Sequence, residues 1–177
     1  MDHDLPEKIE AILKSADISG FLRNQVGENL KFHHEFRITV SDCPNACSQP
    51  QIKDIGIIGA QVPMVTGNEC IRCNACVEVC KENAVALMTA AEKPEIDFSR
   101  CVTCGQCARA CPTGTIDTGR TGFRVLVGGK LGRHPRLAQE LPGIYSETEV
   151  LDVVRRCINA YKANSRNGER FCGAGER

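Results

Sequence analysis

Apolar residues recur at helical spacing near the start of the chain. Over residues 5–16 they fall three and four positions apart, which predicts a helix with one buried face. Pro6 suits the first turn of this helix, and Gly20 is its predicted stop. A second, weaker helix is predicted from Phe21 to Leu30.

The last predicted helix begins at Ser146. Glu149 follows three residues later, and this pair is typical of a capping box at a helix N-terminus. The apolar positions that follow share one helix face, and Cys157 is therefore expected in the core. They are Val150, Leu151, Val154, Cys157, Ile158 and Tyr161.

Alternation of apolar and polar residues predicts strands between these helices. Residues 36–40 alternate strictly, which is typical of a half-buried strand. The same reasoning predicts strands at 55–58 and 122–127, and two short ones at 84–87 and 115–118. The chain is therefore predicted to be an α+β protein.

Composition excludes several classes of protein. The chain has 177 residues and zero formal net charge, which argues against general nucleic-acid binding. No stretch approaches ~20 consecutive apolar residues, so no membrane span is expected, and the acidic N-terminus lacks an apolar signal core. Twelve cysteines indicate metal ligation in a reducing compartment rather than disulfides. We expect a cytoplasmic protein of anaerobic habit.

Eight of the twelve cysteines form two runs with the same spacing, C-x2-C-x2-C-x3-C. The flanking stretches 69–87 and 100–118 align at an offset of 31 residues. This is the spacing of a two-cluster bacterial ferredoxin, in which the fourth cysteine of each run ligates the other [4Fe–4S] cluster. The spacing assigns cluster one to Cys70, Cys73, Cys76 and Cys111, and cluster two to Cys101, Cys104, Cys107 and Cys80.

Zinc and disulfides are the alternative interpretations of these runs, but zinc sites usually use paired C-x2-C knuckles. Each half of the repeat is too small to bury a core, so the cluster bonds would hold the module together. Helix and strand signals occur on both sides of it. We therefore interpret 67–119 as a ferredoxin module inserted into one domain made of 1–66 and 120–177. Three loosely connected pieces are the alternative.

Another cysteine pair, in the sequence Cys43-Pro-Asn-Ala-Cys47, follows the strand predicted at 36–40. The stretch from Phe36 to Pro50 resembles the sirohaem half-motif of nitrite and sulfite reductases. Residues 53–59 and 127–137 fit the same family. The inserted ferredoxin resembles the dissimilatory and anaerobic sulfite reductase branch. The resemblance implies a sirohaem reductase-like α/β half-domain around the insert.

The resemblance also implies cofactor contacts. Cys43 and Cys47 resemble the second ligand pair of the [4Fe–4S] cluster beside the sirohaem, and Asn45 belongs to the same motif. Cys47 resembles the thiolate that bridges this cluster to the sirohaem iron. The resemblance therefore allows sirohaem and a third [4Fe–4S] cluster in addition to the two ferredoxin clusters.

A basic stretch from Gly119 to Arg136 contains five Lys or Arg residues and no acid. The acid groups of sirohaem need cationic and amide partners, and Gly128-Gly129 would let backbone approach a ligand closely. An ordinary solvated basic loop is the alternative. By resemblance, the residues assigned to sirohaem are Arg124, Lys130, Arg133 and Arg136.

The family's cluster beside sirohaem needs four cysteines, and none precedes Cys43 in this chain. The chain is then a piece or split subunit of a reductase whose partner supplies the missing ligands, or a degenerate relative without sirohaem. In a third explanation, Cys43 and Cys47 pack or bind something unrelated. Cys157, expected in the core, and Cys172, in the C-terminal tail, do not complete the ligand set.

These observations predict an iron–sulfur oxidoreductase component of sulfite or nitrite reductase type, incomplete as this chain alone. It would pass electrons from a donor protein through two [4Fe–4S] clusters toward a sirohaem site that reduces a small oxyanion, sulfite or nitrite. A partner chain would complete that site. The alternative is a ferredoxin-like carrier without its own catalytic site, and a redox-sensing or assembly subunit is a third class.

Overall fold

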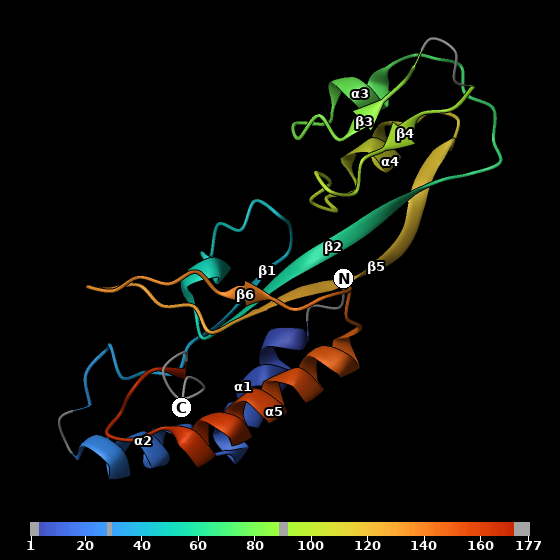
Figure 1. The fold of residues 1–177 in the computed structure, drawn as a ribbon. Helices are drawn as coiled ribbons and strands as arrows, with labels where there is room; N and C mark the ends of the chain where they lie inside the picture. Colours follow the sequence, from blue (N-terminus) through green and yellow to red (C-terminus); the bar gives the residue numbers. More distant parts are fainter. Residues whose placement is uncertain (1–3, 28–29, 89–91, 172–177) are drawn as a thin grey trace. The chain divides into compact units, whose positions relative to one another are not determined.

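The computed structural model describes residues 4–27, 30–88 and 92–171 (Figure 1). The chain divides into two compact units. The first unit comprises Met1–Ile58 and Phe123–Arg177, and the second comprises Gly59–Gly122.

A four-stranded sheet has the strand order β1-β2-β5-β6. The first pair of strands is parallel, with Ile38 opposite Ile55, and the last pair is antiparallel, with Leu126 opposite Glu140. The mixture of helices with this sheet agrees with the predicted α+β class (Figure 1). The strands are β1 (Ile38–Ser41), β2 (Ile55–Val65), β5 (Ile116–Val127) and β6 (Gln139–Glu140).

Strand β5 unites two strands that the apolar pattern separates. The pattern predicts strands at 115–118 and 122–127, because polar residues interrupt it between them. The structure keeps the intervening residues extended. Gly119 lies so close to Met64 that an added Cβ would come 3.1 Å from the Met64 side chain. The continuous strand therefore packs against a neighbouring side chain at Gly119. The alternation of apolar and polar residues in the sequence cannot predict such a contact.

Among the described residues three α-helices belong to the first unit, and the predicted stop at Gly20 and start at Phe21 are both wrong, because the second helix begins at Ile18. The predicted stop at Gly20 instead lies inside the second helix, where the Asp17 carboxylate accepts the Gly20 N–H (3.0 Å) as an N-cap. That helix ends at Val26, and the predicted continuation to Leu30 includes residues 28 and 29, which lie outside the described residues. The helices are α1 (Leu5–Ser15), α2 (Ile18–Val26) and α5 (Glu147–Asn164).

The capping box predicted for the last helix is confirmed. The Glu149 carboxylate accepts the Ser146 N–H (2.7 Å), and the Ser146 hydroxyl accepts the Glu149 N–H (3.4 Å). The predicted apolar face is also confirmed, because Val154 and Ile158 are fully buried and Cys157 packs against the same core. This local signal therefore identified both the start of α5 and its buried side.

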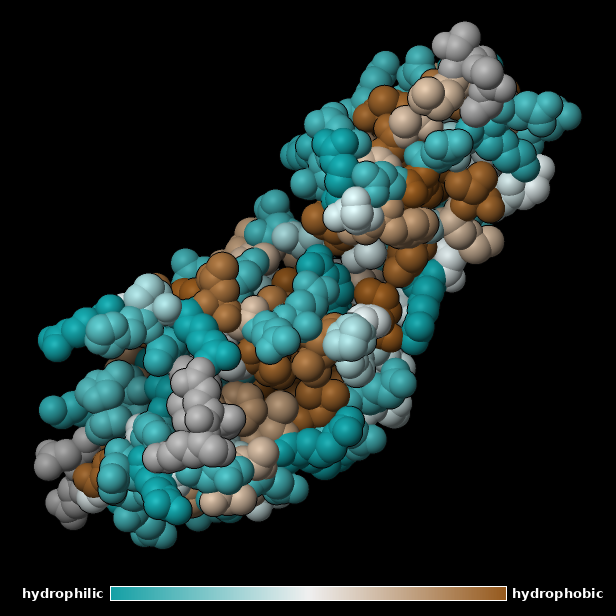
Figure 2. Space-filling model, in the orientation of Figure 1, coloured by the Kyte–Doolittle hydropathy of each residue, from teal (hydrophilic) through white to brown (hydrophobic). Residues whose placement is uncertain are grey.

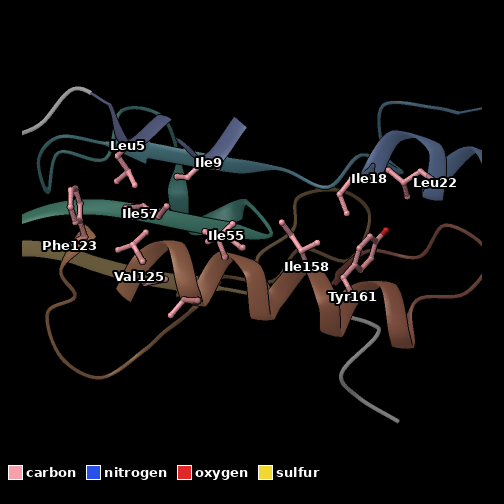
Figure 3. Close-up of a cluster of buried hydrophobic side chains, with 13 residues drawn as sticks. Leu5, Ile9, Ile18, Leu22, Ile55, Ile57, Phe123, Val125, Ile158 and Tyr161 are labelled. Atoms are coloured by element: carbon pink, nitrogen blue, oxygen red, sulfur yellow. The ribbon is translucent and has the colours of Figure 1, made fainter. Parts of the chain in front are cut away.

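Buried side chains from α1, α2 and α5 meet those of β2 and β5 in one hydrophobic core. Figure 3 shows Leu5 and Ile9 of α1 near Ile55 and Ile57 of β2, with Ile158 of α5 in the same cluster. Because the core joins elements from both ends of the chain, the first unit depends on residues that the second unit separates in sequence.

Asp54, directly before β2, is a buried charge with three partners in the first unit. Its carboxylate accepts the Arg37 backbone N–H (2.8 Å) and two N–H groups of the Arg170 guanidinium (3.0 and 2.6 Å). The Asp54 backbone carbonyl accepts the Gly128 N–H (2.8 Å). Asp54 therefore joins the chain before β1, the end of β5 and the C-terminal segment.

The second unit is small and has its own core around two buried cysteines. Cys76 and Cys107 pack with Val85 and Ile116. Large apolar side chains also reach its surface, and Figure 2 shows apolar atoms exposed over this unit; Ile71 is 63% exposed. Besides parts of β2 and β5, its elements are α3 (Ala75–Glu78), β3 (Val85–Ala86), β4 (Glu95–Ile96) and α4 (Gln106–Ala110).

Replacing Asp54 by Asn should lower the free energy of unfolding by about 3 kcal/mol, because the Arg170 charge would stay in a mostly buried position without its counter-ion. Anaerobic urea denaturation followed by far-UV circular dichroism measures the loss. Asp152→Asn is the matched control: its ion pair with Arg155 (2.8 Å) is exposed and is worth no more than about 0.5 kcal/mol. Equal losses in the two variants would contradict the role of Asp54.

Candidate functional site

The two cysteine runs adopt the same backbone conformation. In each run, a turn with two residues in the left-handed region comes directly before the short helix, α3 or α4. A third left-handed residue follows each run. These positions recur 31 residues apart, as the sequence repeat does. The pairs are Arg72 with Thr103 (φ 57° and 55°), Asn74 with Gly105 (61° and 71°), and Asn83 with Gly114 (50° and 65°).

Left-handed turns in both runs aim backbone N–H groups at cysteine sulfurs. The Arg72 N–H donates to the Cys70 sulfur and the Thr103 N–H donates to the Cys101 sulfur, each at 3.4 Å. The fourth cysteine of each run also accepts an N–H group: Ala84 donates to Cys80 (3.3 Å) and Ile116 donates to Cys111 (3.4 Å). Hydrogen bonds of this kind stabilise an anionic thiolate, which is the form that binds metal.

The third cysteine of each run is buried among sulfurs. Burial raises the pKa of Cys76, and the neighbouring sulfurs of Cys111 and Cys70 raise it further. The sulfurs that act on the Cys76 pKa thus come from its own run and from the other run, and both belong to the set predicted for cluster one.

Burial likewise raises the pKa of Cys107 to about 11, with contributions from Cys101 and Cys104. These three cysteines belong to the set predicted for cluster two. A proton keeps a buried thiol neutral, and metal ligation replaces that proton by a bond to a cation.

Cys111 differs from the other cysteines in its electrostatics. Burial alone would raise the pKa of Cys111, but hydrogen bonds from the Ile116 amide and from Thr113 outweigh it and hold the pKa below its ordinary value. The Thr113 hydroxyl lies 3.7 Å from the Cys111 sulfur. Cys111 therefore becomes a thiolate more readily than Cys76, whose pKa burial raises.

Among the described residues, no three His, Cys, Asp or Glu side chains converge closely enough to hold a single metal ion. The four ligands of a [4Fe–4S] cube each bind a different iron at a different corner. Each predicted set offers four cysteines, the ligand number of such a cube.

Cys43 and Cys47 lie in an exposed loop of the first unit, between β1 and the short 3-10 helix η1 (Pro50–Ile52). The Asn45 side-chain amide lies 3.6 Å from the Cys47 sulfur and donates to it. The loop is fastened at one end, because the Ser48 hydroxyl donates to the Val40 carbonyl (3.1 Å). Both predicted thiols are thus presented at the surface on a loop that β1 holds.

The basic stretch meets the backbone that follows this cysteine loop. The Gly129 N–H donates to the Lys53 carbonyl (2.9 Å), and the Ala138 N–H donates to the Gln51 carbonyl (2.7 Å). An added Cβ on Gly129 would come 2.6 Å from the Gln51 carbonyl oxygen. The close approach that Gly128-Gly129 was predicted to give a ligand is therefore occupied, at Gly129, by the chain itself.

The four basic residues assigned to sirohaem differ in their surroundings. Arg124 forms a bidentate ion pair with Glu140, with both nitrogen–oxygen distances 2.6 Å. Lys130 and Arg136 exchange two backbone hydrogen bonds (2.9 and 3.0 Å), which close a loop that also carries Arg133. Arg133 and Arg136 are exposed and Lys130 is half-buried. The loop thus presents cations to solvent, whereas the Arg124 charge is already compensated.

The remaining cysteines do not join these groups among the described residues. Cys157 packs against the core of the first unit, and burial raises its pKa to about 11. Cys172 lies outside the described residues. Gln61 and Arg109, which contact the second cysteine run, were missed by sequence reasoning. For Arg109 the sequence offers one signal, its position between the ligand cysteines Cys107 and Cys111.

Comparison with known proteins places these features in a family. Residues 17–173 match the family described as "Nitrite and sulphite reductase 4Fe-4S domain". The chain is 38% identical over 128 residues to the coenzyme F420-dependent sulfite reductase of Methanocaldococcus jannaschii, a match that covers 72% of this chain and 20% of that protein. It is 35% identical over 55 residues to one subunit of the anaerobic sulfite reductase of Salmonella typhimurium, covering 31% of this chain and 16% of that subunit.

A solved structure has a similar fold. The crystal structure of dissimilatory sulfite reductase I matches 78% of this chain and 39% of its own, with a TM-score of 0.51 and 18% sequence identity. The chain spans about a fifth of the Methanocaldococcus protein. No helix in the described part of the chain is long and apolar enough to cross a membrane.

Loading of iron–sulfur clusters should become more favourable as pH rises. Cys107, with its pKa near 11, is protonated at neutral pH and must lose that proton to bind iron. Each thiol that is still protonated adds about a tenfold gain in affinity per pH unit. Anaerobic reconstitution against a fixed chelator at pH 7 and pH 8 measures this. A Cys157→Ala control should keep the same dependence, and loading that is independent of pH would contradict the prediction.

Proposed function

The chain belongs to the nitrite and sulphite reductase 4Fe-4S domain family, and from this we propose that it is an electron-transferring component of a sulfite, or alternatively nitrite, reductase. The observation that carries the proposal is the sulfur environment of the second unit. Two cysteine runs with matching left-handed turns aim N–H groups at their sulfurs, and sulfurs of both runs help to raise the pKa of the buried Cys76.

We propose that this unit holds two [4Fe–4S] clusters within an inserted ferredoxin module at 67–119. Cluster one would take Cys70, Cys73, Cys76 and Cys111, and cluster two Cys101, Cys104, Cys107 and Cys80. The effect of Cys111 and Cys70 on the Cys76 pKa supports the first set, and the effect of Cys101 and Cys104 on the Cys107 pKa supports the second. The clusters supply one-electron carriage when bound. The protein supplies thiolates, N–H donors and burial, which set the reduction potential.

In the first unit, sirohaem and a third cluster fit the residues only in part. Cys43 and Cys47 offer two of the four thiolates that a cube needs. Lys130, Arg133 and Arg136 lie on a loop whose base bonds to the backbone following the cysteine loop. We propose that a partner chain, or a further part of a longer protein, supplies the remaining ligands. Arg124 would have to exchange its Glu140 carboxylate for one from the cofactor.

The partners proposed are therefore an electron-donor protein and a chain that completes the oxyanion site. The donor would deliver electrons to the clusters, and the completed site would reduce sulfite or nitrite in a reducing, cytoplasmic setting.

A ferredoxin-like carrier is the second candidate, because this chain has only two of the four cysteines for a third cluster. Iron analysis and a visible spectrum after anaerobic purification separate the two. About eight irons fit two cubes, whereas about thirteen irons with sirohaem bands, twelve in three cubes and one in sirohaem, fit the reductase site.

Replacing Cys104 by Ala should remove one cluster and leave the other. The iron content should fall from about eight to about four per chain, because a cube contains four irons and loses a corner ligand. Iron and sulfide analysis with electron paramagnetic resonance of the reduced protein measures the change. Cys157→Ala, which alters a thiol packed in the first unit's core, should keep both clusters. Survival of both in Cys104→Ala would overturn the ligand assignment.

Replacing Cys47 by Ser should abolish sirohaem coupling and spare the ferredoxin clusters. The experiment uses the chain purified with the partner that completes the site, and compares sirohaem absorbance with iron content. We expect the sirohaem signal to change while the roughly eight irons of the second unit stay. Ser48→Ala is the nearby control, since its hydroxyl fastens the loop without offering a thiolate. An unchanged sirohaem signal in Cys47→Ser would show that Cys47 is not the bridge.

A further inference from the structure

Arg109 of α4 folds back onto the second cysteine run. Its guanidinium donates to the Cys104 carbonyl (3.1 Å) and to the side-chain oxygen of Gln61 (2.8 Å). All three residues belong to the second unit. Two nitrogens of the Arg109 guanidinium are thus held, one of them on the backbone of a proposed cluster ligand. Neither of these two partners is a carboxylate, so neither neutralises the arginine charge.

Gln61 also closes the turn of that run from the other side. Its N–H donates to the Thr103 carbonyl (2.7 Å), and it forms a parallel bridge with Cys104. Gly105 is buried beneath it at φ 71°, and an added Cβ there would come 2.3 Å from the Gln61 side-chain oxygen. Gln61 of strand β2 and Arg109 of α4 thus hold the Cys104 turn between them, and we call these two residues the clamp.

The first cysteine run has different residues at the positions that repeat these. Glu78 stands where Arg109 does, and Asn74 stands where Gly105 does. Cys73 is exposed, whereas Cys104 is only partly so. The Arg72 guanidinium of the first run donates to the Met88 carbonyl (3.1 Å). Two runs with the same ligand spacing therefore differ in the charge of the residue at the Arg109 position and in the solvent exposure of the second cysteine.

We propose that Arg109 is a positioning residue that raises the reduction potential of cluster two selectively. The inference rests on the proposed function, because it requires two clusters in this unit. A cube with four thiolates is anionic and becomes more so on reduction, so a nearby fixed cation favours the reduced form. The clamp keeps that cation beside Cys104. Arg100, the other cation next to this run, instead interacts with Asp97.

Potentiometric reduction of the full chain, monitored by electron paramagnetic resonance, tests this with three variants. Arg109→Gln should lower the reduced-to-oxidised ratio of one cluster about tenfold at a fixed potential, a shift of about 59 mV for one electron. Arg109→Lys keeps the charge and should restore most of that ratio. Arg155→Gln, which removes an exposed arginine from the first unit, should change neither cluster.

Gln61→Glu gives a second measurement in case Arg109→Gln loses iron. It keeps an acceptor for Arg109 and adds a negative charge that offsets the guanidinium, so the same cluster should again become harder to reduce. Equal shifts of both clusters, no shift in either variant, or a loss in Arg109→Lys as large as in Arg109→Gln would overturn the role of Arg109. A wild-type protein without about eight irons would instead refute the two-cluster function itself.

Discussion

The first unit depends on a single buried carboxylate. Asp54 is fully buried, and its charge is matched by the Arg170 guanidinium and the Arg37 amide. A buried charge that loses its partner is strongly destabilising, so the segments that supply these partners are fixed together. The Asp54 carbonyl also fixes Gly128, where the basic loop begins. The cysteine loop and the basic loop thus share one anchor, although about eighty residues separate them in sequence.

The second unit obeys a different constraint, since its core consists partly of cysteines that we propose as cluster ligands. Cys76 and Cys107 occupy the positions that aliphatic side chains fill in an ordinary small domain. A thiolate in such a place needs a cation or several donors. The left-handed turns supply N–H donors to other cysteines of the runs, Cys70, Cys101, Cys80 and Cys111, and each non-glycine residue in this conformation is strained. Cys76 and Cys107 instead stay neutral by keeping a proton, which metal ligation would replace by a bond to a cation.

Sequence reasoning succeeded where the signal is local. The capping box at Ser146 and Glu149 gave the start of α5, and the period of 31 residues is matched by the turn conformations. It failed at one local signal, because the Asp17 side chain caps a new helix where the stop at Gly20 was expected. It also failed where distant residues decide. Asp54 and Arg170 form an ion pair although 116 residues separate them, and no periodic pattern in the sequence predicts such a pair.

The buried turn at Gly105 has a consequence for the repeat. Copying the first half over the second would place an asparagine under Gln61, where even a Cβ would come 2.3 Å from the side-chain oxygen. The steric fit of one glycine against one strand therefore makes the two halves non-interchangeable, even though their ligand spacing is the same.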